Sequence, residues 1–518
     1  STFGANLLLE GPLLKKKDYS LSYILSAKNS YLSKTSTSIY SYMNKELPYD
    51  YLDLYGKLTL ATDNGSKINI FGLNFTDKVN QYEAIQNFNW VNRAFGTNFL
   101  IIPGTSSALV EGVIAYSDYT MNMNETTTNQ NQMSNIGGFN VGMSVTNFFG
   151  DDRLKYGMEM EGNTTKTSYK INDTITDYST EIGLYAIYKL LYRNVLVEPS
   201  LRLSYYASLG DVFLEPRLSA KWNVTKKFRF KLASGMYSQT FLDTKSDRDI
   251  VNLFTGYLTV TPDLNIVDSF RGNPINSYVQ TSNHFIFGAE YDILRNFNLN
   301  VELYYKTMSN LTSINRDKLY ADDQEHIEKP GYLRKEYTVE NGKAYGGDFS
   351  LKYDDGRLYV WTIYSLGKVI REGEMQTYAP HYDRRHNVNV LINYQMGQSR
   401  DFEISVRWNY GSGFPYSLTA SMVEMLDFSN GINSDFISQN GTLTTIYGEL
   451  NSERLPNYHR LDISAKKRFD IGKRSILEIN LSVTNVYNRN NLFYWNRITS
   501  QRVDQLPIMP SLGITYTF

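Results

Sequence analysis

Histidine and acidic side chains that could hold a metal ion gather most densely in one short stretch of the chain. Histidine and carboxylate groups suit zinc and similar ions. The stretch spans thirteen positions and contains Glu374, His381, Asp383 and His386. A polar junction between a loop and a strand explains the same residues, and this is the interpretation we favour. We predict no metal site.

Two further groups are interpreted in the same way. His459 is followed by Arg460 and Asp462, which we expect to form an ion pair across neighbouring strands rather than a catalytic site. The second group, Asp322-Asp323 with Glu325 and His326, lacks the full spacing of carboxylates around a turn that a calcium loop needs. A solvated loop is the expectation.

The motifs of the common enzyme classes are absent. There is no nucleophile elbow, no phosphate-binding glycine loop and no metalloprotease helix. The chain has 0 cysteines, which excludes thiolate catalysis, disulfides and cysteine-held metals. We therefore predict that the protein is not an enzyme, has no catalytic residue and needs no cofactor.

Aromatic side chains in the long polar stretches are the candidate ligand-binding residues. Their rings could stack on a sugar or an apolar ligand. The candidates are Phe254, Tyr257, Phe270, Tyr278, Tyr416, Phe428, Phe436 and Tyr447. Aromatic residues are frequent throughout, with 42 Tyr and 26 Phe, so their presence in loops does not identify a site by itself.

The elements that position these residues are strands, because apolar and polar residues alternate along most of the chain. In the segment 402–410, Phe, Ile, Val, Trp and Tyr alternate with Glu, Ser, Arg and Asn. This period of two is typical of a strand with one apolar and one polar face. The polar face carries charges and must be hydrated. Its predicted lumen-facing members are Glu215, Arg217, Lys221, Glu302, Arg407, Arg460 and Asp462.

Strand and loop lengths favour a membrane barrel over a soluble β-sandwich. The alternating segments run for about 10 to 15 residues, longer than the strands of most soluble sheets and suited to a tilted membrane crossing. Tight turns such as Asp63-Asn64-Gly65 and Asp354-Asp355-Gly356 alternate with long polar connections. The long connections are 241–281, 310–340, 368–384 and 415–455. Sorting of short turns to one end and long loops to the other is the outer-membrane pattern.

Composition agrees with one membrane-embedded domain. The 518 residues show no linker, so we predict a single barrel domain over 1–518. No run approaches 18 apolar residues, which excludes transmembrane helices. The formal net charge of -1 gives no reason to expect a nucleic acid partner. Abundant tyrosine suits the aromatic girdles of a barrel.

The alternation predicts 21 strands, the last from Pro510 to Phe518. A terminal strand ending in an aromatic residue belongs at the periplasm, so the first strand, near Thr2 to Leu13, runs inward. A chain that enters from the periplasm then needs one more strand before Ser1. We therefore expect an all-β transmembrane antiparallel barrel of about 22 strands, with the first strand and a lumen plug lying upstream of this segment.

Several motifs, in order along the chain, resemble the barrel of TonB-dependent outer-membrane transporters. The early ones are Leu8-Leu9-Glu10-Gly11-Pro12-Leu13 with Lys15-Lys16-Lys17, and Tyr49 to Leu54 with Lys57. The later ones are His284 to Glu290, Asn300 to Lys306, Tyr382 to Asn387, Arg454 to Asp462, Asn485 to Asn491 and Gly513 to Phe518. The resemblance is best to the branch with a carboxypeptidase-regulatory-like N-terminal domain.

This resemblance implies energised uptake of a scarce nutrient across the bacterial outer membrane. The nutrient could be a siderophore, vitamin, oligosaccharide or peptide. Implied partners are outer-membrane lipid, the protein's own plug, the TonB complex reached through the N-terminal part, and a surface lipoprotein. A transporter-like scaffold in an outer-membrane complex and a passive pore remain the alternative functions.

Overall fold

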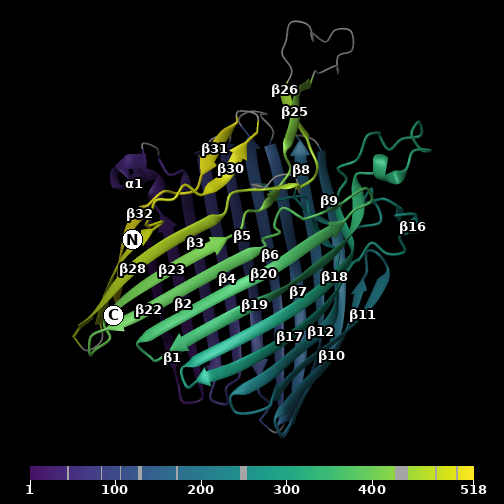
Figure 1. The fold of residues 1–518 in the computed structure, drawn as a ribbon. Helices are drawn as coiled ribbons and strands as arrows, with labels where there is room; N and C mark the ends of the chain where they lie inside the picture. The colour runs from purple at the N-terminus through teal and green to yellow at the C-terminus, as the bar shows by residue number, and fades with distance from the viewer. Residues whose placement is uncertain are drawn as a thin grey trace. The chain divides into compact units, whose positions relative to one another are not determined.

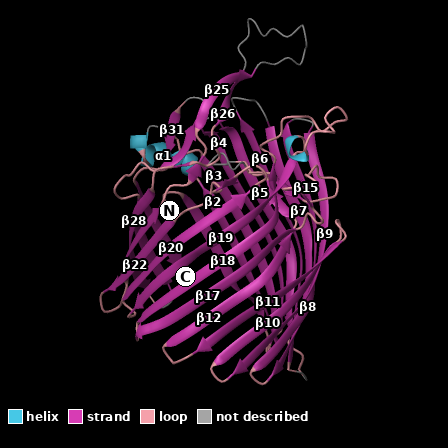
Figure 2. Ribbon diagram, turned by 45° about the vertical axis from the view of Figure 1, so that its right-hand side comes forward, coloured by secondary structure: helices cyan, strands magenta, loops and turns pink. Residues whose placement is uncertain are grey.

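The computed structural model describes residues 1–518 except 44–45, 83–84, 105–106, 126–130, 171–172, 246–253, 426–441, 473–474 and 498–499. Strands dominate the described residues, and helical turns occur only in connections between strands (Figure 2). These are α1 (Leu32–Ile39) and the 3₁₀ turns Ser41–Met43 and Gly331–Leu333. No helix in the described part is both long and apolar enough to cross a membrane.

The chain divides into two compact units. Unit 1 comprises Ser1–Lys245, Phe254–Glu290 and Lys306–Asn341, and unit 2 includes Tyr291–Tyr305 and Gly342–Phe518. The strands β17 (Gln280–Leu294), β18 (Phe297–Ile314) and β19 (Tyr337–Asp354) contribute residues to both units. The single-domain organisation over 1–518 stays a prediction.

Unit 1 contains twelve strands that pair with their sequence neighbours in antiparallel order, from β1 to β12. Their bounds are β1 (Gly4–Lys15), β2 (Tyr19–Ser30), β3 (Tyr49–Thr62), β4 (Lys67–Tyr82), β5 (Ile85–Ile101), β6 (Ala108–Glu125), β7 (Asn131–Phe149), β8 (Asp152–Lys170), β9 (Asp173–Tyr192), β10 (Val195–Tyr206), β11 (Asp211–Asn223) and β12 (Phe228–Gln239).

Unit 2 contains a second antiparallel run, in the order β20, β22, β23, β28, β29 and β32. Their bounds are β20 (Leu358–Glu372), β22 (His386–Met396), β23 (Phe402–Gly411), β28 (Tyr458–Ile471), β29 (Ser475–Thr484) and β32 (Met509–Thr517). The two-residue strand β21 (Thr377–Tyr378) pairs with the end of β20.

Short hairpins form within the long connections. In unit 1 these are β13 (Phe241–Asp243) with β14 (Tyr257–Thr259), and β15 (Ser269–Phe270) with β16 (Asn273–Pro274). In unit 2 they are β24 (Pro415–Tyr416) with β27 (Glu453–Arg454), β25 (Thr419–Met425) with β26 (Thr442–Tyr447), and β30 (Leu492–Asn496) with β31 (Gln501–Asp504). Figure 1 shows β25 and β26 standing beyond the ends of the neighbouring strands of unit 2.

The predicted strand number is confirmed. Within the described residues 22 strands belong to one antiparallel sheet, and without the two-residue β21 there remain the 21 long strands expected from the sequence. The tight turns also form where they were predicted. Gly65, Gly356, Gly397 and Gly472 all have positive φ angles there, between 69° and 88°, a conformation that glycine adopts without steric cost.

Strand length was underestimated. The predicted range was about 10 to 15 residues, but β4 to β9 contain 16 to 20 residues. The pairing of these strands continues beyond their apolar section, as the register of β7 with β8 out to Met133 and Ser168 shows. Strands likewise extend into two predicted loops, since β18 reaches Ile314 and β20 reaches Glu372.

Register places the alternating residues on two distinct faces. Met143, Met158, Leu184 and Leu203 stand opposite one another on β7 to β10. They belong to an apolar face on which Met143, Met158 and Leu184 each keep half of their surface exposed. A continuous exposed apolar surface of this kind is typical of contact with a membrane. The opposite face of the same strands carries polar and charged residues and is called the polar face below.

Candidate ligand-binding face

A network of charged residues lies on the polar face of unit 1. Arg202 on β10 donates to Glu159 on β8 at 2.7 Å and to Glu181 on β9 at 3.1 Å. On β11, Arg217 donates to Glu215 at 2.5 Å. Arg202 and Glu215 are direct register partners, which is why the two pairs meet.

Hydroxyl groups complete this network. Glu215 is almost fully buried and accepts hydrogen bonds from Ser204 at 3.2 Å and from Ser238 at 2.5 Å. Tyr206 and Ser238 are joined through their hydroxyl oxygens at 2.8 Å. Since an unpaired buried carboxylate would cost several kcal/mol or more, these donors explain how the acid is tolerated. The predicted lumen-facing residues Glu215 and Arg217 lie at the centre of the network.

The two long connections of unit 1 fold into a cluster with an apolar core of its own, called the cap below. The connection after β12 and the first residues of β19 supply this core, and Leu258 and Val260 are fully buried. Its buried members are Leu242, Leu258, Val260, Ile266, Val267, Tyr337 and Val339. The sequence analysis treated these stretches as polar loops. The short apolar alternation at Tyr257 to Val260 was the signal that could have indicated a strand there.

The cap is anchored on the polar face of β6 to β9 through β14. The Tyr257 amide donates to the Ser134 hydroxyl at 3.0 Å, and the Thr167 hydroxyl donates to the Tyr257 carbonyl at 2.8 Å. The Tyr257 ring meets Tyr119 edge to face at 6.1 Å. The backbone segment of β14 therefore covers part of the polar face of these strands.

Charged pairs hold the cap together. Arg316 donates to Glu340 at 2.5 Å, and the Glu340 side chain is only 2% exposed. Asp322 is paired with Arg334 and Lys335. Burial acts to raise the pKa of Asp322, but its hydrogen bonds to Lys335 and Arg334 outweigh that effect and lower the pKa from its usual value. Asp322 is therefore bound into the cap, whereas Asp323 and Glu325 of the same predicted loop are exposed to solvent as expected.

In unit 2 the loops at the ends of the strands meet around Asp383. Its carboxylate, 1% exposed, accepts hydrogen bonds from the Val369 amide at 2.7 Å and from the Arg454 guanidinium at 2.5 Å. Arg454 also donates to the carbonyls of Asp383 and Gly413 at 3.1 Å. Two motifs that lie 71 positions apart in the sequence are thus joined by one buried ion pair. We call Val369, Asp383, Gly413 and Arg454, together with the loop residues next to them, the rim.

Arg384, the residue after Asp383, lies between two aromatic rings. Its guanidinium carbon is 4.1 Å from the centroid of Phe414 and 5.9 Å from that of Tyr458. A methyl group at Gly411 would collide with the guanidinium in this position, so the glycine leaves the space that the side chain of Arg384 occupies. Burial lowers the pKa of Arg384, which shows that its surroundings penalise the charged form.

The other residues predicted to face the lumen lie outside the network around Arg202 and Glu215. Arg460 and Asp462 do form an ion pair, at 2.9 Å, but within β28 rather than across neighbouring strands as predicted. Residues two apart on a strand share a face, and Asp462 also accepts from the Asn485 amide. Arg407 stands opposite Asp462 in register. Lys221 faces Lys231 on β12, and Glu302 accepts from Asn300 at 3.0 Å.

The aromatic candidates are dispersed, and no measured contact assigns any of them to a ligand. Tyr257 and Tyr278 pack in or against the cap, Phe270 lies in the β15–β16 hairpin, and Tyr447 lies under Arg497 at 4.9 Å. Phe254 is close to the anchored end of the cap in sequence, and Tyr416 lies in β24. Phe428 and Phe436 fall outside the described residues.

No group of three or more histidine, cysteine or acidic residues in the described ranges is arranged to hold a metal ion. Asp383 and His386, which the sequence brings close together, have different partners in the structure. Asp383 binds Arg454, whereas the His386 ring is exposed and contacts the Tyr364 hydroxyl at 3.0 Å. His459 contacts the Tyr487 hydroxyl at 2.7 Å.

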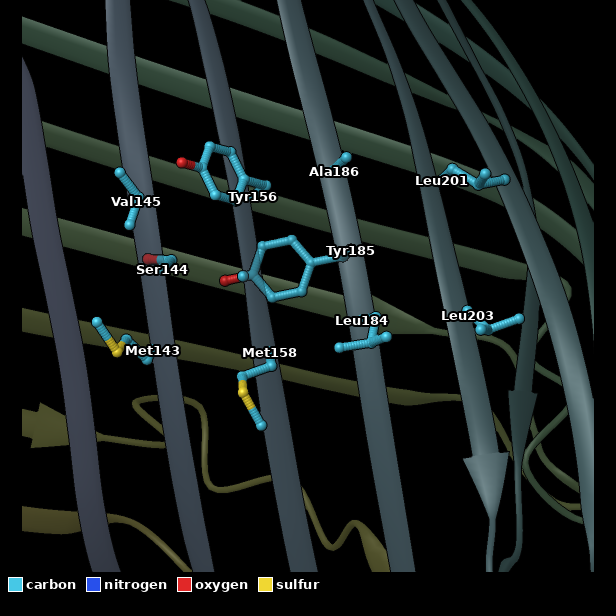
Figure 3. Close-up of a pocket in the computed structure, with 11 residues that line it drawn as sticks. Met143, Ser144, Val145, Tyr156, Met158, Leu184, Tyr185, Ala186, Leu201 and Leu203 are labelled. Carbon is cyan, nitrogen blue, oxygen red and sulfur yellow. The ribbon is translucent and has the colours of Figure 1, made fainter.

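A hollow of about 540 Å³ lies on the apolar face of unit 1. Figure 3 shows Met143, Met158, Leu184 and Leu203 in one row of its lining across adjacent strands. Because the hollow is shallow, apolar and opposite to the charged network, it fits the packing of a lipid chain better than the recognition of a polar solute.

Comparison with known proteins gives the fold. No protein-family model and no curated protein matches the sequence. Among solved structures, the ferric-catecholate import receptor Fiu of E. coli K12 is similar with a TM-score of 0.67 and 9% identity, covering 100% of this chain and 80% of that one. The FrpB iron transporter of Neisseria meningitidis is similar with a TM-score of 0.65 and 12% identity, and the match covers 99% of this chain and 78% of that one.

A third relative in structure is the ferric enterobactin receptor PfeA of Pseudomonas aeruginosa, in a mutant form. It gives a TM-score of 0.65 and 11% identity, covering 100% of this chain and 77% of that one. The chain has the fold of the TonB-dependent outer-membrane receptors. The fold class expected from the sequence, an all-β antiparallel sheet of the transmembrane-barrel type, is therefore confirmed. Its assignment to the carboxypeptidase-regulatory-like branch stays a prediction.

Proposed function

We propose that this chain forms the barrel of an importer that takes up one specific nutrient across the outer membrane with energy supplied through TonB. The observation that carries the proposal is the match in fold, over 99 to 100% of the chain, to receptors and transporters named for iron uptake. A ferric siderophore is accordingly the substrate that we propose first. A vitamin, an oligosaccharide and a peptide are the alternatives.

The polar face supports a role in selective uptake. Its charged network in unit 1 is satisfied by neighbouring strands, and the cap and the rim place ordered segments at the ends of the strands. A wide unselective pore has no need of ordered, ion-paired connections. The importer would also require a plug segment and contact with the TonB complex, and a surface lipoprotein is a further candidate partner.

The proposal is tested by uptake measurements on the complete protein in its own outer membrane. A strain lacking the gene and its complemented strain are supplied with ferric enterobactin labelled with radioactive iron, with and without a protonophore. We expect saturable uptake in the complemented strain only, abolished by the protonophore because transport depends on the inner-membrane proton gradient.

The rival functions give different results in the same assay. Uptake that is unsaturable and unaffected by the protonophore would indicate a passive pore. If no ferric siderophore, vitamin, oligosaccharide or peptide is taken up while surface proteins co-purify with the barrel in stable amounts, the scaffold replaces the importer.

A further inference from the structure

The side chain of Arg384 projects onto the polar face at the rim of unit 2. Its guanidinium lies over Gly411, a polar-face position that stands between Asn387 on β22 and Tyr458 on β28. Phe414 and Tyr458 flank the guanidinium with their rings. Arg384 is therefore directed toward the face that solutes would meet, and away from the apolar face.

The guanidinium of Arg384 has no anionic partner among the residues that the structure describes. Its Nε is buried without a hydrogen-bond acceptor. The adjacent acid, Asp383, is already engaged by Arg454 at 2.5 Å and has Arg385 at 4.0 Å. Two arginines, Arg454 and Arg385, thus share this carboxylate, and the positive charge of Arg384 remains uncompensated among the described residues.

A buried or half-buried charge without a counter-ion is costly, and a rigid guanidinium fork is well suited to a carboxylate. The two rings add apolar surfaces at the sides of the fork, where the body of a flat ligand could stack. Gly411 leaves the space that this arrangement needs. The surroundings match an acidic group carried on a planar ring.

We propose that Arg384, with Phe414 and Tyr458, forms a binding subsite for an aromatic carboxylate or a similar ring-bearing anion. The subsite deepens the proposed import function, on which its use in the cell rests, by naming the chemical class of the solute. Binding itself is a property of the purified protein and can be measured without transport.

The test uses the full-length protein in detergent, with benzoate as the probe and benzamide as its neutral counterpart of the same shape. Affinity is measured by saturation-transfer NMR titration for the wild type, R384Q, R384K and the control R400Q. Arg400 lies in the connection between β22 and β23, where it donates to the Gly356 carbonyl at 2.9 Å, away from the rim. Folding of each variant is checked by heat-dependent migration on a gel.

We expect the wild type and R400Q to bind benzoate equally and benzamide more weakly. R384Q should bind benzoate about tenfold or more weakly, as expected for the loss of a charge-assisted hydrogen bond. R384K keeps the charge but loses the planar fork, so its affinity for benzoate should fall by a smaller factor. If R384Q does not fold, the affinity of R384K serves as the test.

The proposal is overturned if the wild type fails to bind benzoate, or if R384Q and R384K bind it as the wild type does. Equal affinity for benzoate and benzamide would overturn it as well, because the negative charge would then play no part. Absence of energised uptake by a protein that still binds benzoate through Arg384 would refute the import function and leave the subsite in place.

Discussion

Asp383 provides the negative charge around which the arginines of the rim are arranged. Replacing Asp383 with Asn keeps the shape but leaves Arg454, itself about one third exposed, without a charged acceptor. We expect Asp383→Asn to lower the free energy of unfolding by about 1–3 kcal/mol, the range for a buried hydrogen bond to a charged group. Denaturant titration in lipid vesicles measures this change.

Asp470 serves as the matched control at the residue scale. It pairs with Arg468 at 3.0 Å, but both side chains are largely exposed, at 69% and 49%. Exposed pairs contribute about 0–1 kcal/mol, so Asp470→Asn should leave the unfolding midpoint nearly unchanged. Equal effects of the two substitutions would show that burial of the Asp383 pair does not stabilise the rim.

At the scale of the element, the long strands of unit 1 extend past their apolar section. On the apolar face of β8 the residues change from Leu154, Tyr156, Met158 and Met160 to Thr164 and Lys166. At about 3.3 Å per residue, Lys166 lies about 26 Å along the strand from Met158. Because barrel strands tilt by about 40°, the stretch of β8 from Leu154 to Lys166, about 40 Å long, rises about 30 Å along the membrane normal, which exceeds the apolar band of about 25 Å. The outer part of β8 should therefore stand in water on both faces.

The absence of cysteine makes this prediction easy to test. A membrane-impermeant maleimide applied to intact outer membranes should label Lys166→Cys readily and Met158→Cys several-fold more slowly, because lipid covers Met158. After denaturation both variants should react equally, which controls for expression. Similar labelling rates in intact membranes would mean that the membrane boundary does not fall between these positions.

At the scale of the whole molecule, the cap and the sheet are stabilised by different interactions. The cap has its own apolar core, in which Val260 is fully buried, whereas the sheet is held by hydrogen-bonded strand pairs. Val260→Asp places an unpaired charge in that core at a cost of several kcal/mol. We expect proteolytic cleavage within 241–279, with the folded, heat-modifiable migration of the sheet preserved.

Leu319 gives the corresponding control, since it lies in the connection between β18 and β19 with 73% of its surface exposed. Leu319→Asp should leave the cap resistant to protease. Loss of heat-modifiable migration in Val260→Asp would show that the cap and the sheet fold as one cooperative structure, contrary to this prediction.

The sequence by itself determined the architecture of this protein. Alternation with a period of two identifies the strands, their two faces and their number, and glycines in the tight turns mark one end of the hairpins. These are local properties, because side-chain direction in a strand and the φ angle in a turn depend on the residue and its immediate neighbours. No such local signal predicted α1, whose buried Leu32 and Ser36 depend on contacts of the surrounding loop.

Only the tertiary structure decided which distant residues meet. Asp383 pairs with Arg454 across 71 positions, and Tyr257 lies on Ser134 of a strand far earlier in the chain. Such contacts depend on how loops fold back over the sheet and on which charges remain uncompensated after packing. Periodicity carries no information about either, because long-range pairing is decided by shape and desolvation of the assembled structure.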